Sequence, residues 1–243
     1  MHTDNGLILE NKELAPGIWR MDIETALAKE VLPGQFMQVE VPGFFLRRPI
    51  SVCNTKKDTV TLVYRIAGSG TDVMSHMKEG ETINLFGPLG NGFPIEDRDV
   101  LLIGGGIGVP PLLKTAEACL ENNHKVTVVM GFNSEKEIIL KEDFEKAGCL
   151  VSIATMDGSY GTKGTVMDAI QENHISEQFV LACGPLPMLK AVTNAYREGY
   201  ISLEARMACG MGACMGCVVK DKDGNSLRVC KEGPVFRIGK VVL

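Results

Sequence analysis

The sequence lacks any hydrophobic run long enough to cross a bilayer. Its best candidate, Val100–Leu113, is bounded by charged residues and interrupted by four glycines and two prolines. The N-terminus, Met1–Glu13, is polar and acidic, so it also lacks the basic and then apolar layout of a secretory signal. Together these absences predict a cytoplasmic protein.

The chain also lacks an excess of basic residues, with 25 Lys and Arg against 30 Asp and Glu and a formal net charge of −5. A nucleic-acid or anionic-membrane partner would favour a basic face, so neither is expected. No acid–base or nucleophile constellation is evident either. The four histidines lie far apart and are interpreted as surface or packing residues: His2, His76, His124 and His174.

What is present is a 243-residue chain with 45% hydrophobic residues, enough to bury a core in one large or two modest domains. Residues 1–97 contain short β-type runs between Pro and Gly turns, which predict an antiparallel barrel. Residues 98–204 alternate apolar strands with helices, a rhythm typical of a parallel sheet covered by helices. Residues 205–243 form a Cys- and Gly-rich tail with no core of its own.

The pattern also predicts individual elements. In the first segment it predicts strands at Phe36–Val41, Pro49–Cys53, Thr59–Ile66 and Thr82–Phe86, and a short helix that begins after Thr71 as its cap. In the second it predicts strands at Val100–Ile103, Lys125–Met130, Leu150–Ala154, Phe179–Ala182 and Ile201–Leu203. The predicted helices there are Pro110–Asn122, Glu142–Ala147, Val166–Glu172 and Pro187–Glu198.

Eight cysteines in a cytoplasmic chain favour metal binding or redox chemistry over disulfides. Four of them fall in the tail: Cys209, Cys214, Cys217 and Cys230. The first three follow C-x4-C-x2-C and the fourth comes after twelve intervening residues, which is the pattern of plant-type [2Fe–2S] sites. Gly210, Gly212 and Gly216 allow close backbone approach and let N–H groups point at the sulfurs. The spacing therefore predicts that these four thiolates hold a [2Fe–2S] cluster.

Two other interpretations of the tail stay open. A structural zinc site prefers paired C-x2-C spacings, and only one is present. Buried structural cysteines would not need so many glycines. The sequence assigns no role to three of the remaining cysteines, Cys53, Cys119 and Cys149.

A glycine string follows a predicted strand and opens a predicted helix: Gly104, Gly105, Gly106 and Gly108. Glycines at such a place let a diphosphate approach backbone N–H groups at a helix N-terminus, where the dipole favours anions. The string is not G-x-G-x-x-G, because Val109 and Pro111 stand where a third glycine would fall. It predicts nucleotide binding, with an ordinary tight turn as the alternative.

A second string, Cys183-Gly184-Pro185, ends the fourth predicted strand of the same segment. Ligands of open α/β sheets bind outside the carboxyl ends of the strands. Cys183 is therefore predicted to face a nicotinamide, with a buried small residue at a strand end as the alternative.

The barrel segment contains Arg47 and Arg48 followed by Pro-Ile-Ser, then Tyr64-Arg65 and Gly70-Thr71. Arginine forks and a hydroxyl suit a pyrophosphate, and Tyr64 could cover a ring system. Taken alone, the two arginines also fit a solvated surface pair.

Together these strings resemble the ferredoxin reductase superfamily, in which a flavin barrel precedes a nucleotide domain. Within it, the order of barrel, nucleotide domain and C-terminal cluster resembles the electron transfer subunits of type B dihydroorotate dehydrogenases. The resemblance covers nearly the whole chain, and the cluster string is its most specific part. Its strings are Leu46–Ser51, Gly87–Phe93, Gly104–Pro111, Asp157–Thr162 and Arg206–Gly210.

The resemblance implies cluster ligation by the four tail cysteines and FAD contacts at Arg48, Pro49, Ile50, Ser51, Val63, Tyr64, Arg65, Gly70 and Thr71. It also implies a partner, an FMN-containing catalytic subunit that oxidises dihydroorotate in pyrimidine biosynthesis, with two copies of each chain. Electrons are then expected to pass from that FMN through the cluster and FAD to NAD+. A flavin is needed between the last two carriers because NAD takes two electrons as a hydride and the cluster carries one.

Two rival functions remain at this point. The chain could be an NAD(P)H-dependent reductase, self-standing or a subunit serving a hydrogenase or a ferredoxin, with the same cofactors and another partner. It could instead be a redox-sensing module, although a sensor would not need the two nucleotide strings.

Overall fold

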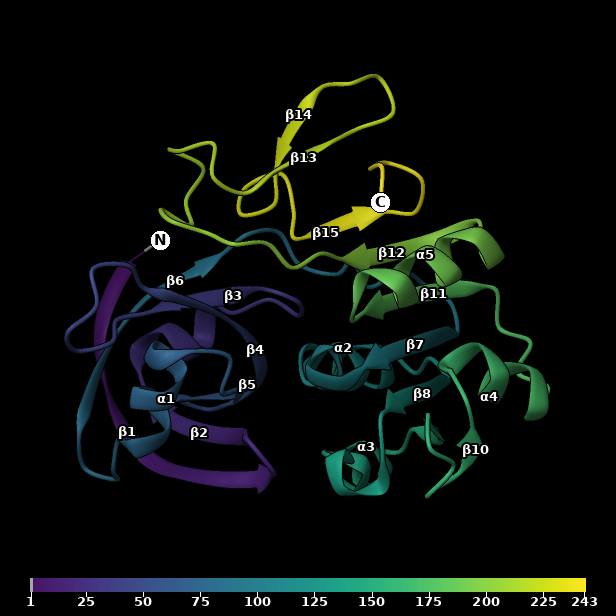
Figure 1. The fold of residues 1–243 in the computed structure, drawn as a ribbon, viewed down its shortest axis with the longest axis horizontal. Helices are drawn as coiled ribbons and strands as arrows, with labels where there is room; N and C mark the ends of the chain where they lie inside the picture. Colours follow the sequence, from purple (N-terminus) through teal and green to yellow (C-terminus); the bar gives the residue numbers. More distant parts are fainter. Residues whose placement is uncertain (1) are drawn as a thin grey trace.

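The computed structural model describes residues 2–243 and shows three bodies, a barrel, a sheet with helices on both faces, and a tail that lies over both (Figure 1). The barrel is closed and antiparallel, in the order β1-β2-β5-β4-β3-β6. Its strands are β1 (His2–Ala15), β2 (Ile18–Glu24), β3 (Phe36–Val39), β4 (Arg48–Lys56), β5 (Thr59–Arg65) and β6 (Thr82–Leu89). A 3-10 turn, η1 (Ala26–Glu30), and one helix, α1 (Ser69–His76), complete it.

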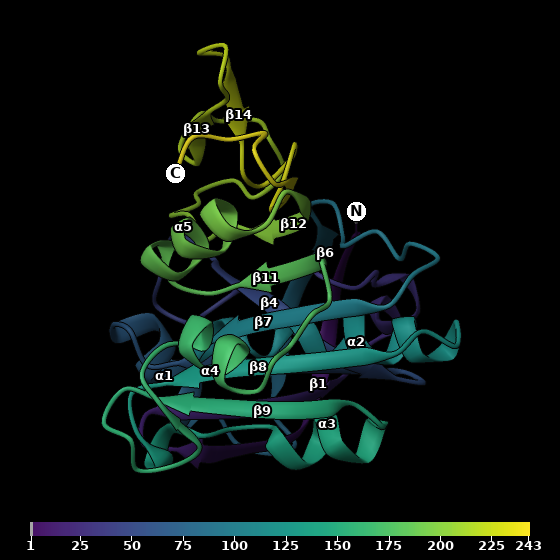
Figure 2. The same cartoon turned by 90° about the vertical axis from the view of Figure 1, so that its right-hand side faces the viewer.

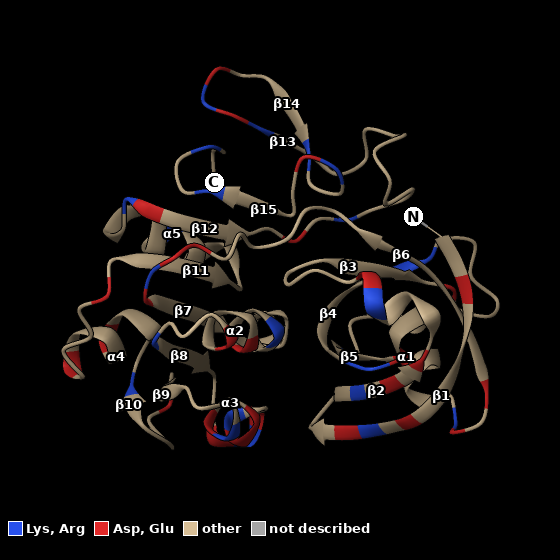
Figure 3. Cartoon of the chain, turned by 180° about the vertical axis from the view of Figure 1, so that it is seen from behind, with Lys and Arg blue, Asp and Glu red and all other residues tan. Residues whose placement is uncertain are grey.

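The predicted strands of the first segment are confirmed as β3 to β6, but two strands and one boundary were not foreseen. The sequence analysis identified neither β1 nor β2, because both carry charges of both signs between their apolar residues, which weakens the strand pattern (Figure 3). The helix prediction is wrong at its start, since α1 begins at Ser69. Thr71 is the third helical residue, and its hydroxyl accepts from the N–H groups of Ala67 and Gly68, at 2.9 and 3.3 Å.

The second body is a seven-stranded sheet in the order β10-β9-β8-β7-β11-β12-β15. Its strands are β7 (Val100–Gly105), β8 (Val126–Phe132), β9 (Leu150–Thr155), β10 (Thr162–Lys163), β11 (Phe179–Cys183), β12 (Glu198–Ser202) and β15 (Val235–Arg237). All neighbours are parallel except β12 and β15. The predicted βα alternation is therefore confirmed.

Helices cover both faces of this sheet (Figures 1 and 2). They are α2 (Pro111–Glu121), α3 (Lys141–Ala147), α4 (Val166–Glu172) and α5 (Leu186–Ala195), with the 3-10 turns η2 (Gly106–Gly108) and η3 (Glu135–Glu137). The helix α2 contacts β4 and so joins the sheet to the barrel, whereas α4 and α5 contact each other on the opposite face. The last helix is shorter than predicted, because the chain enters β12 at Glu198.

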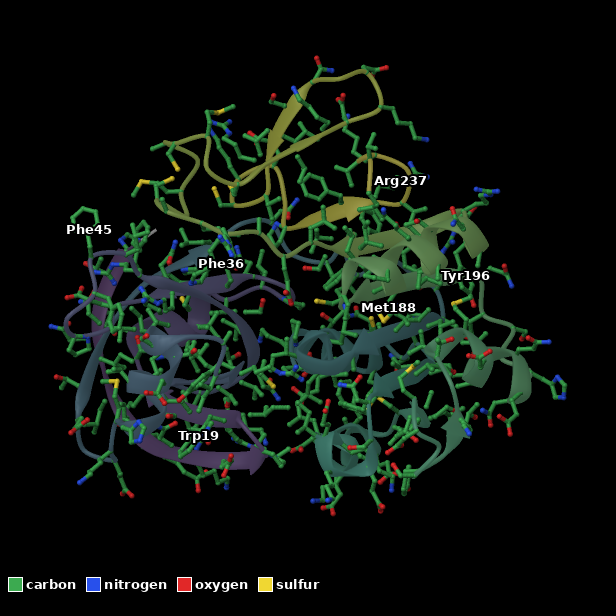
Figure 4. All side chains as sticks on the ribbon, viewed as in Figure 1. Trp19, Phe36, Phe45, Met188, Tyr196 and Arg237 are labelled. Carbon is green, nitrogen blue, oxygen red and sulfur yellow. The ribbon has the colours of Figure 1, made fainter. Side chains whose placement is uncertain are left out.

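The tail has a hairpin of its own, β13 (Val218–Lys220) and β14 (Ser226–Arg228), but its core is shared. The strand β15 pairs with β12 of the nucleotide sheet, where Tyr200 lies opposite Arg237. Cys217 and Cys230 lie in one apolar cluster with Phe36 of the barrel, which Figure 4 places beneath the tail. The tail is therefore held by both other bodies.

No helix within residues 2–243 combines the length and the hydropathy that a membrane crossing requires.

Candidate functional site

The four predicted ligand cysteines come together in two pairs. The backbone N–H of Cys214 donates to Sγ of Cys209 at 3.3 Å, and the sulfurs of Cys217 and Cys230 lie 3.2 Å apart. Among the residues that the structure describes, no three His, Cys, Asp or Glu side chains converge as they would on a single metal ion. Two pairs fit two irons that each take two thiolates.

Backbone N–H groups of the glycine-rich loop surround these sulfurs. Burial opposes ionisation of Cys209, but N–H groups from Cys214, Met211 and Ala213 lower its pKa to about 6. Burial and the neighbouring Cys217 thiol raise the pKa of Cys230 to about 12, while the N–H of Gly212 acts in the opposite direction. The loop thus presents donors to the sulfurs, as a thiolate-ligated cluster requires.

An ion pair that the sequence analysis missed fastens this loop. Arg228 donates from Nη1 to the Gly212 carbonyl at 2.6 Å and forms a fork with Glu232, with Nε–Oε2 and Nη2–Oε1 distances of 3.1 and 2.5 Å. The pair flanks Cys230 in the sequence, so it ties the second cysteine pair to the loop of the first. Nothing in the spacing of Arg228 distinguished it from a surface arginine.

The predicted flavin-binding string, residues 46–51, leads into β4, and its two arginines contact different partners. Arg47 is engaged within the barrel, at 2.6 Å from Glu40 and 2.7 Å from Oδ1 of Asn84. The Arg48 guanidinium instead lies 4.4 Å over the Phe44 ring and against the Cα of Gly70, which leaves no room for a Cβ there. Arg48 therefore sits at the N-terminal turn of α1, where a cation, backbone N–H groups and a glycine together fit a diphosphate.

The other predicted flavin contacts are arranged less simply. The Tyr64 side chain is buried in the barrel and donates to Oδ1 of Asn11 at 3.1 Å, and burial raises its pKa. Its ring is thus not free to cover a cofactor ring, which corrects the interpretation of Tyr64 given above. At this point of β5, only the main chain is available to contact a flavin. The Thr71 hydroxyl holds the first turn of α1, as described above, and donates to the Gly68 carbonyl at 3.0 Å.

The nucleotide strings meet at the carboxyl ends of adjacent parallel strands. Cys183 pairs in register with Gly104, and a Cβ on Gly108 would overlap the peptide between Cys183 and Gly184. These glycines are required for close packing of the two turns. The two strings, which the sequence presents separately, thus lie side by side in the fold.

A cavity of about 520 Å³ opens beside these turns. Among its lining residues are Gly105 and Gly106, Gly131 at the end of β8, and Arg65 from the barrel. Cys183 does not line it; the residue is 4% exposed and burial raises the pKa of its thiol to about 12, a placement that fits the alternative of a buried small residue at a strand end. A dinucleotide in this cavity would lie on the glycine string and reach a residue of the flavin barrel.

Two acidic residues of the cavity were not identified from the sequence as site residues. Glu137 accepts from the amide of Asn133 at 2.9 Å and lies 3.7 Å from the Arg65 guanidinium. Glu204, just after β12, also lines the cavity, and surrounding protein raises its pKa while Arg65 lowers it. Glu137 ends the 3-10 turn η3 and Glu204 follows β12, and the sequence gives no periodic signal at either position.

A second hollow, of about 660 Å³, connects the flavin string to the approach to the cluster. Its walls are residues 44–49 of the barrel and residues 205–207 of the tail. Phe45, in this barrel loop, projects into solvent (Figure 4). The cofactor regions assigned from the sequence are thus contiguous in space, whereas the four histidines are scattered over separate elements.

Comparison with known proteins identifies the same segments. Residues 204–242 match the family described as the iron-sulfur cluster binding domain of dihydroorotate dehydrogenase B, and residues 102–194 match the oxidoreductase NAD-binding domain. The electron transfer subunit of dihydroorotate dehydrogenase B (NAD(+)) of Shouchella clausii is 42% identical, covering 97% of this chain and 96% of that protein. The Bacillus cereus subunit is 40% identical over 100% of both.

Solved structures give the same fold. The structure of an NADH-dependent reduced ferredoxin–NADP oxidoreductase, described in terms of flavin-based electron bifurcation, matches with a TM-score of 0.90 and 31% identity, covering 99% of this chain and 91% of that one. The Amycolatopsis cytochrome P450 reductase GcoB shares the fold alone, with a TM-score of 0.69 and 21% identity over 80% of this chain and 65% of its own.

The fold and site therefore define an NAD-linked oxidoreductase of the ferredoxin reductase type, built to use FAD, a [2Fe–2S] cluster and NAD. More narrowly, the chain belongs to the family of dihydroorotate dehydrogenase B electron transfer subunits. This confirms the resemblance inferred from the motifs.

Proposed function

We propose that this chain is the subunit that passes electrons between NAD and a dihydroorotate-oxidising catalytic subunit in pyrimidine biosynthesis. The single observation that carries the proposal is the convergence, in one chain, of two cysteine pairs, a flavin string and a nucleotide cavity on contiguous surfaces. Membership of a family of electron transfer subunits implies a catalytic subunit as the partner. The partner's FMN, two copies of each chain and a location in the cytoplasm are part of the proposal.

The residues take separate roles. Arg48 and the first turn of α1 would hold the FAD diphosphate, β4 and β5 would line the flavin through Pro49–Ser51 and Val63–Arg65, and the four tail cysteines would hold the cluster. The glycines at 104–108 would seat the NAD diphosphate, and the nicotinamide would lie beside the turn that follows Cys183-Gly184, where Pro185 and Met188 line the cavity.

When bound, the flavin supplies the exchange between hydride and single-electron transfer, and the protein supplies placement and electrostatics. Arg65 lines the nucleotide cavity from the barrel, so the same side chain can contact groups on both sides of the boundary between the barrel and the sheet. Buried apolar residues at this boundary, among them Val63 and Leu112, exclude water from it.

We also propose three functional units, residues 1–97 for FAD, 98–204 for NAD and 205–243 for the cluster. The closed barrel, the parallel sheet and the cysteine loop support this division. The antiparallel pairing of β15 with β12 means that the third unit is expected to depend on the second for stability.

The partner is expected to dock over residues 205–220. Cys209 and Cys214 are partly exposed there, and Met211 and Met215 expose flexible apolar side chains. The test is to mix the purified, cofactor-loaded chain with the catalytic subunit and to follow NAD+ reduction driven by dihydroorotate. Coupling only in the mixture is expected, and dihydroorotate oxidation by this chain alone would refute the division of labour.

A second candidate function is supported by the structural match at a TM-score of 0.90 to the ferredoxin–NADP oxidoreductase. In it the chain would serve a ferredoxin or a hydrogenase rather than a dihydroorotate-oxidising subunit. Failure of the mixture to couple, together with efficient NADH-driven ferredoxin reduction, would favour this candidate.

A further inference from the structure

One polar side chain is buried beneath the cluster loop at the surface of the flavin barrel. Gln38 lies in β3 between Met37 and Val39 and is only 1% exposed. Its Nε2 donates to the carbonyl of Ala208 at 3.4 Å, while its Oε1 has no hydrogen-bond partner within residues 2–243. A buried amide with a free acceptor costs stability, so its presence in an apolar strand requires an explanation.

The position of Gln38 relates it to both cofactor regions. On the barrel side it lies directly opposite Pro49, a residue of the flavin string, in the pairing of β3 with β4. On the tail side it packs against Gly210, whose φ is +68° and where an added Cβ would lie 2.5 Å from Nε2. Gly210 follows the predicted ligand Cys209. The side chain of Gln38 therefore lies between β4, which carries the flavin string, and the cluster loop.

The barrel also fixes the tail at a second place. The side chain of Asn91 donates to the carbonyls of Glu232 and Val235, both at 3.0 Å. That contact holds the arm of the tail after Cys230, whereas Gln38 contacts the arm at the first cysteine pair. Among the described contacts, the hydrogen bond that joins a barrel side chain to residues 208–210 is the one donated by Gln38.

We propose that Gln38 is a positioning residue that sets the cluster loop on the flavin barrel and thereby controls electron exchange between FAD and the cluster. It adds no chemical step; it fixes the loop through Ala208 and Gly210, and its free Oε1 can accept a further N–H from the loop. The inference rests on the proposed function, because it takes FAD on β4 and the cluster at Cys209 as its two ends. Placement of reacting groups is a recognised source of rate.

The test compares Gln38→Met with Gln35→Met in the full chain loaded with FAD and cluster. Both changes remove an amide and keep the side-chain length. Gln35 lies in the same segment, but it accepts from the N–H of Leu32 at 2.8 Å and donates to the Gly90 carbonyl at 2.7 Å, so both of its described hydrogen bonds stay within residues 1–97. NADH is mixed anaerobically with each protein, and absorbance separates flavin reduction from cluster reduction. Dithionite, which reduces the cluster directly, serves as the second reductant.

For Q38M we expect normal iron and FAD content, normal flavin reduction by NADH and a several-fold slower cluster reduction by NADH but not by dithionite. Hydrogen exchange at residues 208–212 should rise, and the EPR line shape of the reduced cluster should change. Native rates of cluster reduction in Q38M, or an equal loss in Q35M, would overturn the inference. If Q38M fails to retain FAD, Gln38→Asn replaces it in the same assay. This variant keeps the amide but shortens the side chain by one methylene, which moves the amide away from the Ala208 carbonyl. Failure of NADH to reduce the cluster in the unmodified chain would instead refute the proposed function.

Discussion

Replacing Arg48 by alanine should weaken FAD binding, whereas replacing its neighbour Arg47 should not. The Arg48 guanidinium packs against Gly70 at the first turn of α1, whereas Arg47 donates hydrogen bonds to Glu40 and Asn84. A hydrogen bond to a charged group contributes about 1.5–3 kcal/mol. Because 1.4 kcal/mol corresponds to a factor of ten, loss of the Arg48 contact should raise the FAD dissociation constant by about ten- to a hundredfold.

The assay is titration of the flavin-free protein with FAD, followed by the quenching of flavin fluorescence. Arg47→Ala is the matched control, since it removes the same side chain one residue earlier and should leave the dissociation constant within a few-fold of the unmodified value. Adding Thr71→Ala to Arg48→Ala should weaken binding further by loosening the first turn of α1. Unchanged affinity in Arg48→Ala, or a larger loss in Arg47→Ala, would refute the assignment of the diphosphate to this turn.

Three further outcomes follow from the other sites. Cys214→Ala should abolish the cluster and retain FAD, which iron analysis and visible spectra measure; two irons per chain in the variant would contradict the ligand set. NAD should be preferred to NADP in steady-state kinetics, because Glu137 faces the cavity and the loop at 131–137 has no arginine for a 2′-phosphate. In the cluster-free chain at pH 8, a thiol reagent should modify Cys209 first, since its pKa of about 6 leaves it ionised, and should reach the buried Cys183 and Cys53 much later, since burial raises the pKa of both thiols; mass spectrometry identifies the order.

Signals that depend on spacing marked the cysteines that the structure brings into pairs and the glycine string at which it places a strand, a tight turn and a helix. The spacing of Cys209, Cys214 and Cys217 is a local signal, because a loop that carries three ligands would have to wrap one small object, and the structure brings these three and Cys230 into two pairs. The glycine string is a local signal of the same kind, since the strand, the tight turn and the helix that it predicts follow one another directly. Local chemistry of this kind is encoded within about ten residues.

Contacts between distant segments could not be predicted in the same way. Gln38 and Ala208 are separated by 170 residues, and Arg65 meets Glu137 only because the barrel packs against the sheet. The burial of Tyr64 inside the barrel depends on the two N-terminal strands that the sequence pattern did not identify. Each of these outcomes follows from tertiary packing, which overrides what a residue type suggests on its own.

The arrangement of the three sites determines where a partner can act. Residues 209–230 do not line the nucleotide cavity, which is bounded by the sheet, the barrel and Glu204. We therefore expect a protein that covers only the loop around Met211 and Met215 to leave the lining of that cavity uncovered, so that NAD would exchange while the partner stays bound. A partner placed over the nucleotide cavity would block that exchange and would face no cysteine pair. The exposed cluster loop is consequently the face at which an electron-donating subunit can dock without competing with NAD.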